Sequence, residues 1–286
     1  MVAKGFLEDM GGRFSARESS EIAILPVPYD ETSTWIKGAD KGPLAVLEAS
    51  SELELYDMET CAEPYRHGIF TAPSVEAGGL APEVMVGKVK DAVTGLIDEK
   101  KFVVTLGGEH SVSIGAIKAH SEKFEHMCVL HLDAHADLRD EYKGSRYNHA
   151  CVMARVREIC PFVQVGIRSM SAEESEVVVR EDMFPAHELR SRNNWISDVM
   201  DRLELNVYVS IDLDVFDPAF LPSTGTPQPG GMDWYQVVSL LRAVSVNKNI
   251  VGFDVVELCP NPAEKSSDIL AAKLIYKFLG YIFRNR

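Results

Sequence analysis

The stretch "CVLHLDAHADLRD" (residues 128–140) begins as an apolar run and ends in a cluster of carboxylates and imidazoles. The apolar half predicts a buried β-strand. Side chains two residues apart in a strand point the same way, so Asp133, His135 and Asp137 are expected on one face. Burying unpaired carboxylates costs many kcal/mol, and a bound cation reverses that cost. The stretch therefore predicts a metal site at the end of a strand, with a solvated loop as the alternative.

Short apolar stretches of this kind recur along the whole chain. The predicted strands are 21–28, 68–73, 101–107, 127–133, 162–168, 183–189, 206–214 and 249–258. The predicted helices include 82–100, 111–124, 149–159 and 232–244, with a packed terminal helix over 269–285. Continuous apolar strands separated by helices indicate a parallel sheet that is covered on both faces. We therefore predict a single three-layer α/β/α domain over residues 1–286, with about eight mostly parallel strands.

The bulk composition excludes several classes of protein. The net charge of −14 argues against a nucleic-acid surface, which needs clustered lysine and arginine. The chain has no run of about 18 apolar residues that would predict a membrane span. Its first residues, "MVAKGFLEDMGG", lack the apolar core of a signal peptide. Five cysteines, an odd number without a C-x-x-C pair, indicate free thiols in a reducing cytosol. We therefore expect a cytoplasmic protein.

Reactive side chains collect at the ends of the predicted strands, which is where parallel sheets bind ligands. His110 follows one strand, Asp212 and Asp214 end another, and Glu257 ends a third. The candidate metal ligands are His110, Asp133, His135, Asp137, Asp212 and Asp214. Six ligands are too many for one structural zinc ion, and carboxylates mixed with imidazoles suit Mn²⁺, Fe²⁺, Co²⁺ or Zn²⁺, with manganese the first choice. Two such ions can share a water and lower its pKa towards neutrality.

Three motifs resemble the signatures of the ureohydrolases, the family of arginase and agmatinase. They are "GGEHS" (107–111), "DAHAD" (133–137) and "SIDLDVFDPAF" (210–220) with "TGTPQPGG" (224–231). The segments 26–50 and 252–260 extend the resemblance over nearly the whole chain. It implies that the six candidate ligands hold two manganese ions, that Glu257 binds a guanidinium and that His149 assists proton transfer. It also implies an eight-stranded parallel sheet and a homotrimer or homohexamer.

The resemblance implies hydrolysis of a guanidino group to urea and an amine. Agmatine, which would give putrescine, is the first choice, because the motifs look more like agmatinase than arginase. In addition, Asp140 and Glu141 suit a distal ammonium better than a carboxylate. Aminopropylagmatine, guanidinobutyrate and arginine remain alternatives. A catalytically silent metal-binding scaffold is a further alternative, which the release of urea would exclude.

Three other residues allow two interpretations each. Asp217 either orients a metal ligand, which we favour, or belongs to a turn. His131 is expected to be buried and hydrogen-bonded rather than a ligand. Cys151 follows His149 by two positions, which allows a Cys–His nucleophile, but a packing role is favoured.

Overall fold

The computed structural model describes residues 5–7 and 12–284. Most of the N-terminal segment 1–12, which the sequence analysis examined for a signal peptide, therefore lies outside the described residues. Its strands form one eight-stranded sheet in the order β2-β1-β3-β8-β7-β4-β5-β6, and every pairing is parallel. The strands are β1 Ile22–Val27, β2 Ile69–Thr71, β3 Phe102–Gly107, β4 Met127–Leu132, β5 Phe162–Val165, β6 Met183–Phe184, β7 Asn206–Asp212 and β8 Asn249–Val256. The predicted eight-stranded parallel sheet is therefore confirmed.

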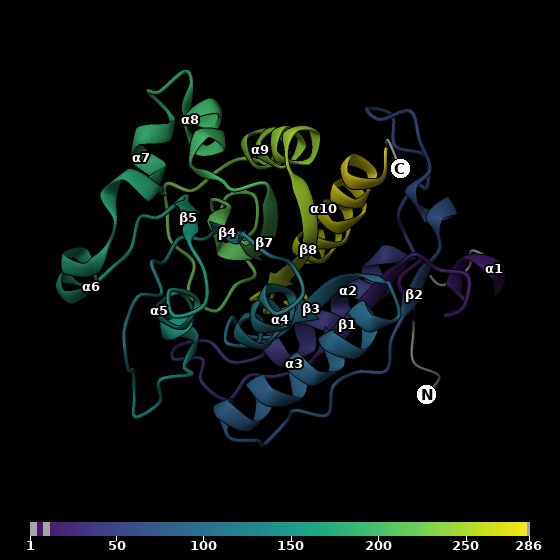
Figure 1. The fold of residues 1–286 in the computed structure, drawn as a ribbon, viewed down its shortest axis with the longest axis horizontal. Coiled ribbons are helices and arrows are strands. Elements are labelled where there is room, and N and C mark those ends of the chain that lie inside the picture. The colour runs from purple at the N-terminus through teal and green to yellow at the C-terminus, as the bar shows by residue number, and fades with distance from the viewer. Residues whose placement is uncertain (1–4, 8–11, 285–286) are drawn as a thin grey trace.

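Helices cover both faces of the sheet (Figure 1). The α-helices are α1 Gly12–Ser15, α2 Gly42–Ser50, α3 Pro82–Asp98, α4 Val112–Ser121, α5 Val152–Val156, α6 Ala172–Val177, α7 Ala186–Leu189, α8 Trp195–Arg202, α9 Trp234–Asn247 and α10 Ser266–Phe283. Short 3₁₀ helices are η1 Ala39–Lys41, η2 Pro64–His67, η3 His149–Cys151, η4 Arg180–Asp182 and η5 Leu213–Val215. No helix within the described ranges is both long and apolar enough to cross a membrane.

Two hydrophobic cores lie on the two sides of the sheet. One is formed with α3, α4 and α5, and the other with α2, α8, α9 and α10. In β1, Ile22 and Ile24 belong to one core and Ala23 and Leu25 to the other, because successive side chains of a strand point to opposite faces. A strand buried on both faces has few polar positions, which is why the strands read as nearly continuous apolar runs.

Some predicted elements differ from the observed ones. The predicted strand 183–189 is a strand only at Met183–Phe184, and it gives way to α7 after Pro185, which has no N–H to continue the ladder. The predicted helix 149–159 is η3 followed by α5 and ends at Val156. The sequence analysis did not predict α2, α6 or α8. Most residues of α2 are buried, so it lacks the polar face that reveals a helical period.

The turn after β3 requires glycine at position 108. A Cβ atom there would lie 2.1 Å from the Tyr29 carbonyl oxygen. The backbone cannot move away easily, because the Gly108 N–H donates to Val27 (2.9 Å) and the Glu257 N–H donates to the Gly108 carbonyl (2.7 Å). We expect Gly108→Ala to lower the free energy of unfolding by about 3 kcal/mol, measured by urea denaturation.

A second glycine provides the control for this substitution. Gly87 lies in α3, and a Cβ atom there would meet no atom within 4 Å. Gly87→Ala is therefore expected to raise the free energy of unfolding by about 0.5–1 kcal/mol. Equal stabilities of the two variants would show that the close approach of Gly108 to Tyr29 is not a constraint on the fold.

Candidate active site

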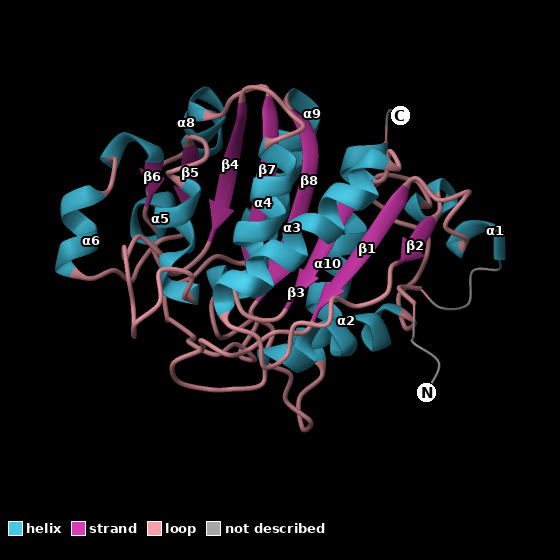
Figure 2. Cartoon of the chain, turned by 60° about the horizontal axis from the view of Figure 1, so that its bottom comes forward, coloured by secondary structure: helices cyan, strands magenta, loops and turns pink. Residues whose placement is uncertain are grey.

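Four neighbouring strands in the middle of the sheet deliver the candidate residues to one edge. His110 follows β3, Glu257 follows β8, Asp212 ends β7 and Asp133 follows β4. Figure 2 shows these strands side by side, with the long loops gathered at their carboxyl ends. The structure thus brings together side chains that are up to 147 positions apart in the sequence.

The six candidate ligands form two adjacent groups that share Asp133. In the first group, the His110 Nδ1 atom lies 3.1 Å from Asp133 Oδ2, 3.2 Å from Asp137 Oδ2 and 3.4 Å from Asp212 Oδ2. In the second group, His135 Nδ1 lies 2.9 Å from Asp214 Oδ2 and 3.5 Å from Asp133 Oδ1. Two sets of ligand atoms are close enough together to bind one ion each: His110, His131, Asp133 and Asp137 form one set, and Asp133, His135 and Asp214 form the other. Asp212 borders the first set through His110.

The reason given for this convergence in the sequence analysis was wrong. Strand β4 ends at Leu132, so Asp133, His135 and Asp137 do not alternate along a strand. Instead, the Asp133 carboxylate accepts the His135 N–H (2.5 Å) and tightens a turn, while Asp137 adopts a left-handed backbone with φ of 53°. Asp214 likewise lies beyond its strand, in η5. Turns rather than strand alternation therefore aim these side chains.

Burial and mutual repulsion disfavour the ionised form of two carboxylates in this cluster. Burial and the nearby Asp214 and Asp133 carboxylates raise the pKa of Asp212 well above its usual range. Burial and Asp133 also raise the pKa of Asp137. Burial opposes ionisation of Asp133 as well, but the imidazoles around it hold its pKa well below its usual range. The site therefore concentrates carboxylates that a cation would stabilise.

The His110 imidazole also fits a metal ligand. Its side chain is fully buried, and its Nδ1 atom has no hydrogen-bond partner of good geometry although it faces three carboxylates. Its Nε2 atom lies 3.0 Å from Ser210 Oγ, which fixes the ring orientation. Nitrogen and oxygen donors in this number suit divalent transition ions.

Glu257 and His149 lie next to the cluster and face each other. The Glu257 Oε1 atom accepts the His110 backbone N–H (2.7 Å) and lies 3.7 Å from His149 Nδ1. Glu257 has a φ of 66°, a strained conformation that marks functional positions in many proteins. Burial lowers the pKa of His149, but the Glu257 carboxylate outweighs it and raises that pKa overall. The pair offers an anion and an imidazole beside the cluster.

The three ambiguous residues have defined partners. His131 is fully buried, and its Nε2 atom lies 2.8 Å from Asp133 Oδ2, so it is a buried, hydrogen-bonded histidine as expected. Asp217 accepts the N–H groups of Gly230 (2.7 Å) and Gly231 (2.9 Å), so it anchors a loop, and the favoured interpretation that it orients a metal ligand is not supported. Burial raises the pKa of the Cys151 thiol to about 12, which is unfavourable for a nucleophile.

The sequence analysis missed Thr32, Glu109 and Arg168. Glu109 stands inside the quoted motif "GGEHS", but its side chain faces a loop that follows β1 rather than the Asp/His cluster. Arg168 donates to the carbonyls of Asp214 (2.6 Å) and Gln228 (2.9 Å) and so joins η5 to the loop 224–231. A lone arginine or threonine at a strand end gives no sequence signal for such contacts.

Asp140 does not offer a free charge to a distal ammonium, contrary to the prediction from the sequence. Arg146 Nη2 lies 3.0 Å from Asp140 Oδ1, and Arg155 pairs with the same oxygen. The charge of Asp140 is therefore already balanced by arginines.

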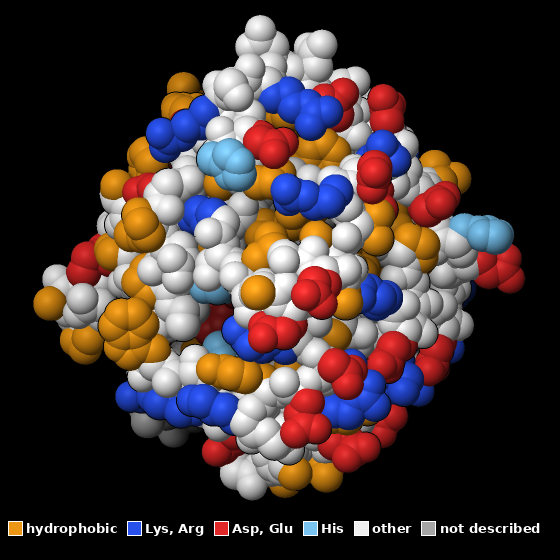
Figure 3. Space-filling view, turned by 90° about the vertical axis from the view of Figure 1, so that its left-hand side faces the viewer, with side chains coloured by type: hydrophobic (Ala, Val, Ile, Leu, Met, Phe, Trp, Pro, Cys, Tyr) orange, Lys and Arg blue, Asp and Glu red, His pale blue; other side chains and the backbone are white. Residues whose placement is uncertain are grey.

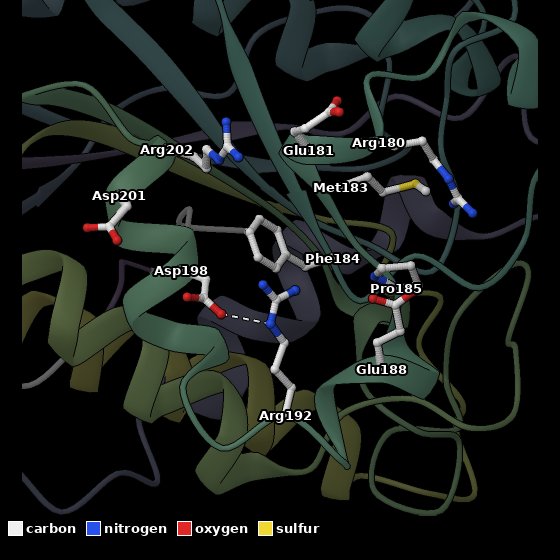
Figure 4. Close-up of a pocket in the computed structure, with 10 residues that line it drawn as sticks. All are labelled: Arg180, Glu181, Met183, Phe184, Pro185, Glu188, Arg192, Asp198, Asp201 and Arg202. Atoms are coloured by element: carbon white, nitrogen blue, oxygen red, sulfur yellow. Dashed lines mark ion pairs between the residues drawn. The ribbon is translucent and has the colours of Figure 1, made fainter.

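A separate cavity of about 570 Å³ lies between β6, α7 and α8 (Figure 4). Its charged groups partly satisfy one another, since Arg192 Nε lies 2.7 Å from Asp198 Oδ2. Figure 3 views the molecule from this side and shows basic side chains interspersed with acidic ones. The cavity contains no histidine and none of the candidate residues, so we do not place the reaction there.

Comparisons with known proteins agree with this geometry. The sequence model of the arginase family matches residues 20–280. The N(1)-aminopropylagmatine ureohydrolase of Synechocystis is 37% identical, over 97% of this chain and 94% of that protein. The agmatinase of Pyrococcus horikoshii is 33% identical, over 92% of each chain. The crystal structure of the agmatine ureohydrolase of Thermoplasma volcanium superposes with a TM-score of 0.88 at 28% identity, covering 99% of this chain and 96% of that one.

Proposed function

This chain belongs to the arginase family and is a hydrolase of amidino groups, and we propose that it releases urea from the guanidino group of a linear cationic amine. The observation that carries the proposal is the pair of Asp/His groups sharing Asp133, with Glu257 directly beside them. A guanidinium is a planar cation, and the buried carboxylate of Glu257 is suited to bind it.

We propose that the two groups hold two divalent cations, with Mn²⁺ the first choice because carboxylates dominate. When bound, such ions supply Lewis acidity and a water of lowered pKa. The proposed ligands are His110, Asp133, His135, Asp137, Asp212 and Asp214. Four carboxylates balance the charge of two divalent ions.

The roles of Glu257 and His149 follow from their positions. Glu257 is held by the His110 N–H, so its second oxygen, Oε2, is left to bind the guanidinium and fix its plane. His149 stands 3.7 Å from Glu257, and its Nε2 atom is buried without a partner. An imidazole in this position can deliver a proton to the leaving amine.

Similarity favours a longer substrate than the one predicted from the sequence. The ureohydrolase of Synechocystis, named for N(1)-aminopropylagmatine, is 37% identical, and the agmatinase of Pyrococcus horikoshii is 33% identical. We therefore favour N(1)-aminopropylagmatine and keep agmatine, with putrescine as its product, as the second candidate. Assembly as a homotrimer or homohexamer stays a prediction.

A substrate panel tests this proposal. Protein loaded with Mn²⁺ is given N(1)-aminopropylagmatine, agmatine, guanidinobutyrate and arginine in parallel, and urea is measured. We expect kcat/KM to be highest for N(1)-aminopropylagmatine and next highest for agmatine. The values for guanidinobutyrate and arginine, which carry a carboxylate, should be far lower. A preference for agmatine would keep the mechanism and restore the first substrate choice. No urea from any of the four would favour a silent scaffold.

A further inference from the structure

The segment between β1 and η1 is held against the active site by one buried carboxylate. The Glu109 Oε2 atom accepts the backbone N–H groups of Thr32 (2.6 Å) and Ser33 (2.9 Å). Its Oε1 atom accepts the hydroxyls of Thr32 (2.6 Å) and Ser111 (2.5 Å). The Glu109 side chain is fully buried, so these four donors replace the water that it has lost.

The Thr32 hydroxyl has a second partner in the active site. Its oxygen accepts the backbone N–H of His149 (2.9 Å), while its proton goes to Glu109. One hydroxyl therefore joins segments that are 117 and 77 residues away from it in the sequence. A hydroxyl is one donor and also an acceptor, so it can serve both partners at once.

The same segment also borders the space above Glu257. A Cβ atom on Gly225 would lie 3.2 Å from the Ile36 carbonyl oxygen and 3.7 Å from Glu257 Oε2. The position of the segment therefore affects both the imidazole of His149 and the access to Glu257. The sheet alone does not fix His149, which lies in η3 beyond a long loop.

We propose that Glu109 and Thr32 form a clamp that sets the position of the His149 imidazole. This inference rests on the proposed function, because it gives the two residues a part in proton delivery to the leaving amine. Thr32 and Glu109 are positioning residues, since neither needs to touch the reacting atoms. A misplacement of about 1 Å at such a distance from the reaction can cost about 100-fold in rate.

Substitutions at Thr32 test the clamp in the full-length, Mn²⁺-loaded protein. Thr32→Val removes the hydroxyl and keeps the branched shape, so we expect kcat to fall by about 10- to 100-fold while KM changes by less than about 3-fold. Thr32→Ser keeps the hydroxyl and is expected to restore kcat to within about 2-fold of the original protein. Bound metal, measured by elemental analysis, should be unchanged in both variants.

Thr60 provides a matched control elsewhere in the chain. Its buried hydroxyl donates to the Asp57 carboxylate (3.0 Å). Neither residue belongs to the candidate site. Thr60→Val is expected to lower the midpoint of urea denaturation and to leave kcat unchanged. A loss of kcat in this variant equal to that of Thr32→Val would show a general effect of lost hydroxyls and overturn the clamp.

The possible outcomes distinguish a failure of the clamp hypothesis from a failure of the proposed function. An active protein in which Thr32→Val keeps its kcat refutes the clamp alone. So does a Thr32→Ser variant as slow as Thr32→Val, or a loss of kcat that is matched by a loss of metal. Thr32→Ala replaces Thr32→Val if the latter does not fold. A protein that releases no urea from any guanidino amine refutes the proposed function and the clamp with it.

Discussion

Asp214→Ala is expected to remove bound metal and urea release together. The Asp214 Oδ2 atom lies 2.9 Å from His135 Nδ1, and its Oδ1 atom accepts the Ala134 N–H (3.0 Å). The carboxylate therefore faces His135 in the second ligand group, and it also holds the turn that carries His135. Loss of an outer partner of a metal ligand costs about 10- to 100-fold in affinity, and loss of a ligand itself should cost more. Metal content by elemental analysis and urea by a colorimetric assay measure the two effects.

Asp268→Ala is the control for this substitution. Asp268 is a buried carboxylate at the start of α10 that pairs with Lys265 (2.8 Å), and it has no contact with the Asp/His cluster. We expect this variant to keep its metal and its activity while losing some stability. Full activity of Asp214→Ala with two ions bound would falsify the ligand assignment.

Glu257→Gln is expected to lower kcat/KM by about 100- to 1,000-fold while metal content stays unchanged. Truncating or neutralising one partner of a buried charge pair costs about 2–5 kcal/mol, and each 1.36 kcal/mol is a factor of ten in rate. Glutamine keeps the shape and can still accept the His110 N–H. It cannot supply the negative charge that binds a guanidinium, so the loss should appear with every guanidino substrate. Steady-state kinetics with the best substrate of the panel measures it.

Glu59→Gln removes a comparable charge from another site. Glu59 Oε2 lies 2.8 Å from Lys277 Nζ on α10, in an ion-pair network that also includes Asp57. This variant should keep its kcat/KM and lose only stability. If Glu257→Gln were as active as Glu59→Gln, the guanidinium would have to be bound by another residue.

Much of the fold followed from local patterns in the chain. Apolar runs flanked by helical stretches predicted the parallel sheet, because a strand buried on both faces carries few polar positions. The predicted strand 183–189 was too long, because Pro185 ends the hydrogen-bonded ladder after Phe184. Helix α2 was missed because burial on most of its residues hides the helical period.

The candidate site was likewise predicted correctly in some respects and wrongly in others. The chain itself placed His110, Asp133, Asp212 and Glu257 at or just past strand ends. Residue chemistry marked the first three as metal ligands, and the family resemblance gave Glu257 its role as the anion that binds a guanidinium. It gave the wrong reason for the convergence of the "DAHAD" motif, because β4 ends at Leu132 and turns aim the side chains. It also supported agmatine through Asp140, whose charge the structure shows to be paired with arginines.

Local hydrophobic pattern and residue identity are enough to predict which side chains stand at the carboxyl ends of strands. Which of these side chains meet depends on how distant parts of the chain pack together. Strands β3 and β4 are consecutive along the chain, yet β8 and β7 lie between them in the sheet and carry Glu257 and Asp212 into the gap. The same packing brings Thr32 between Glu109 and His149. Strand order and loop contacts depend on long-range pairing of nonpolar surfaces, which leaves no mark at any single position of the chain.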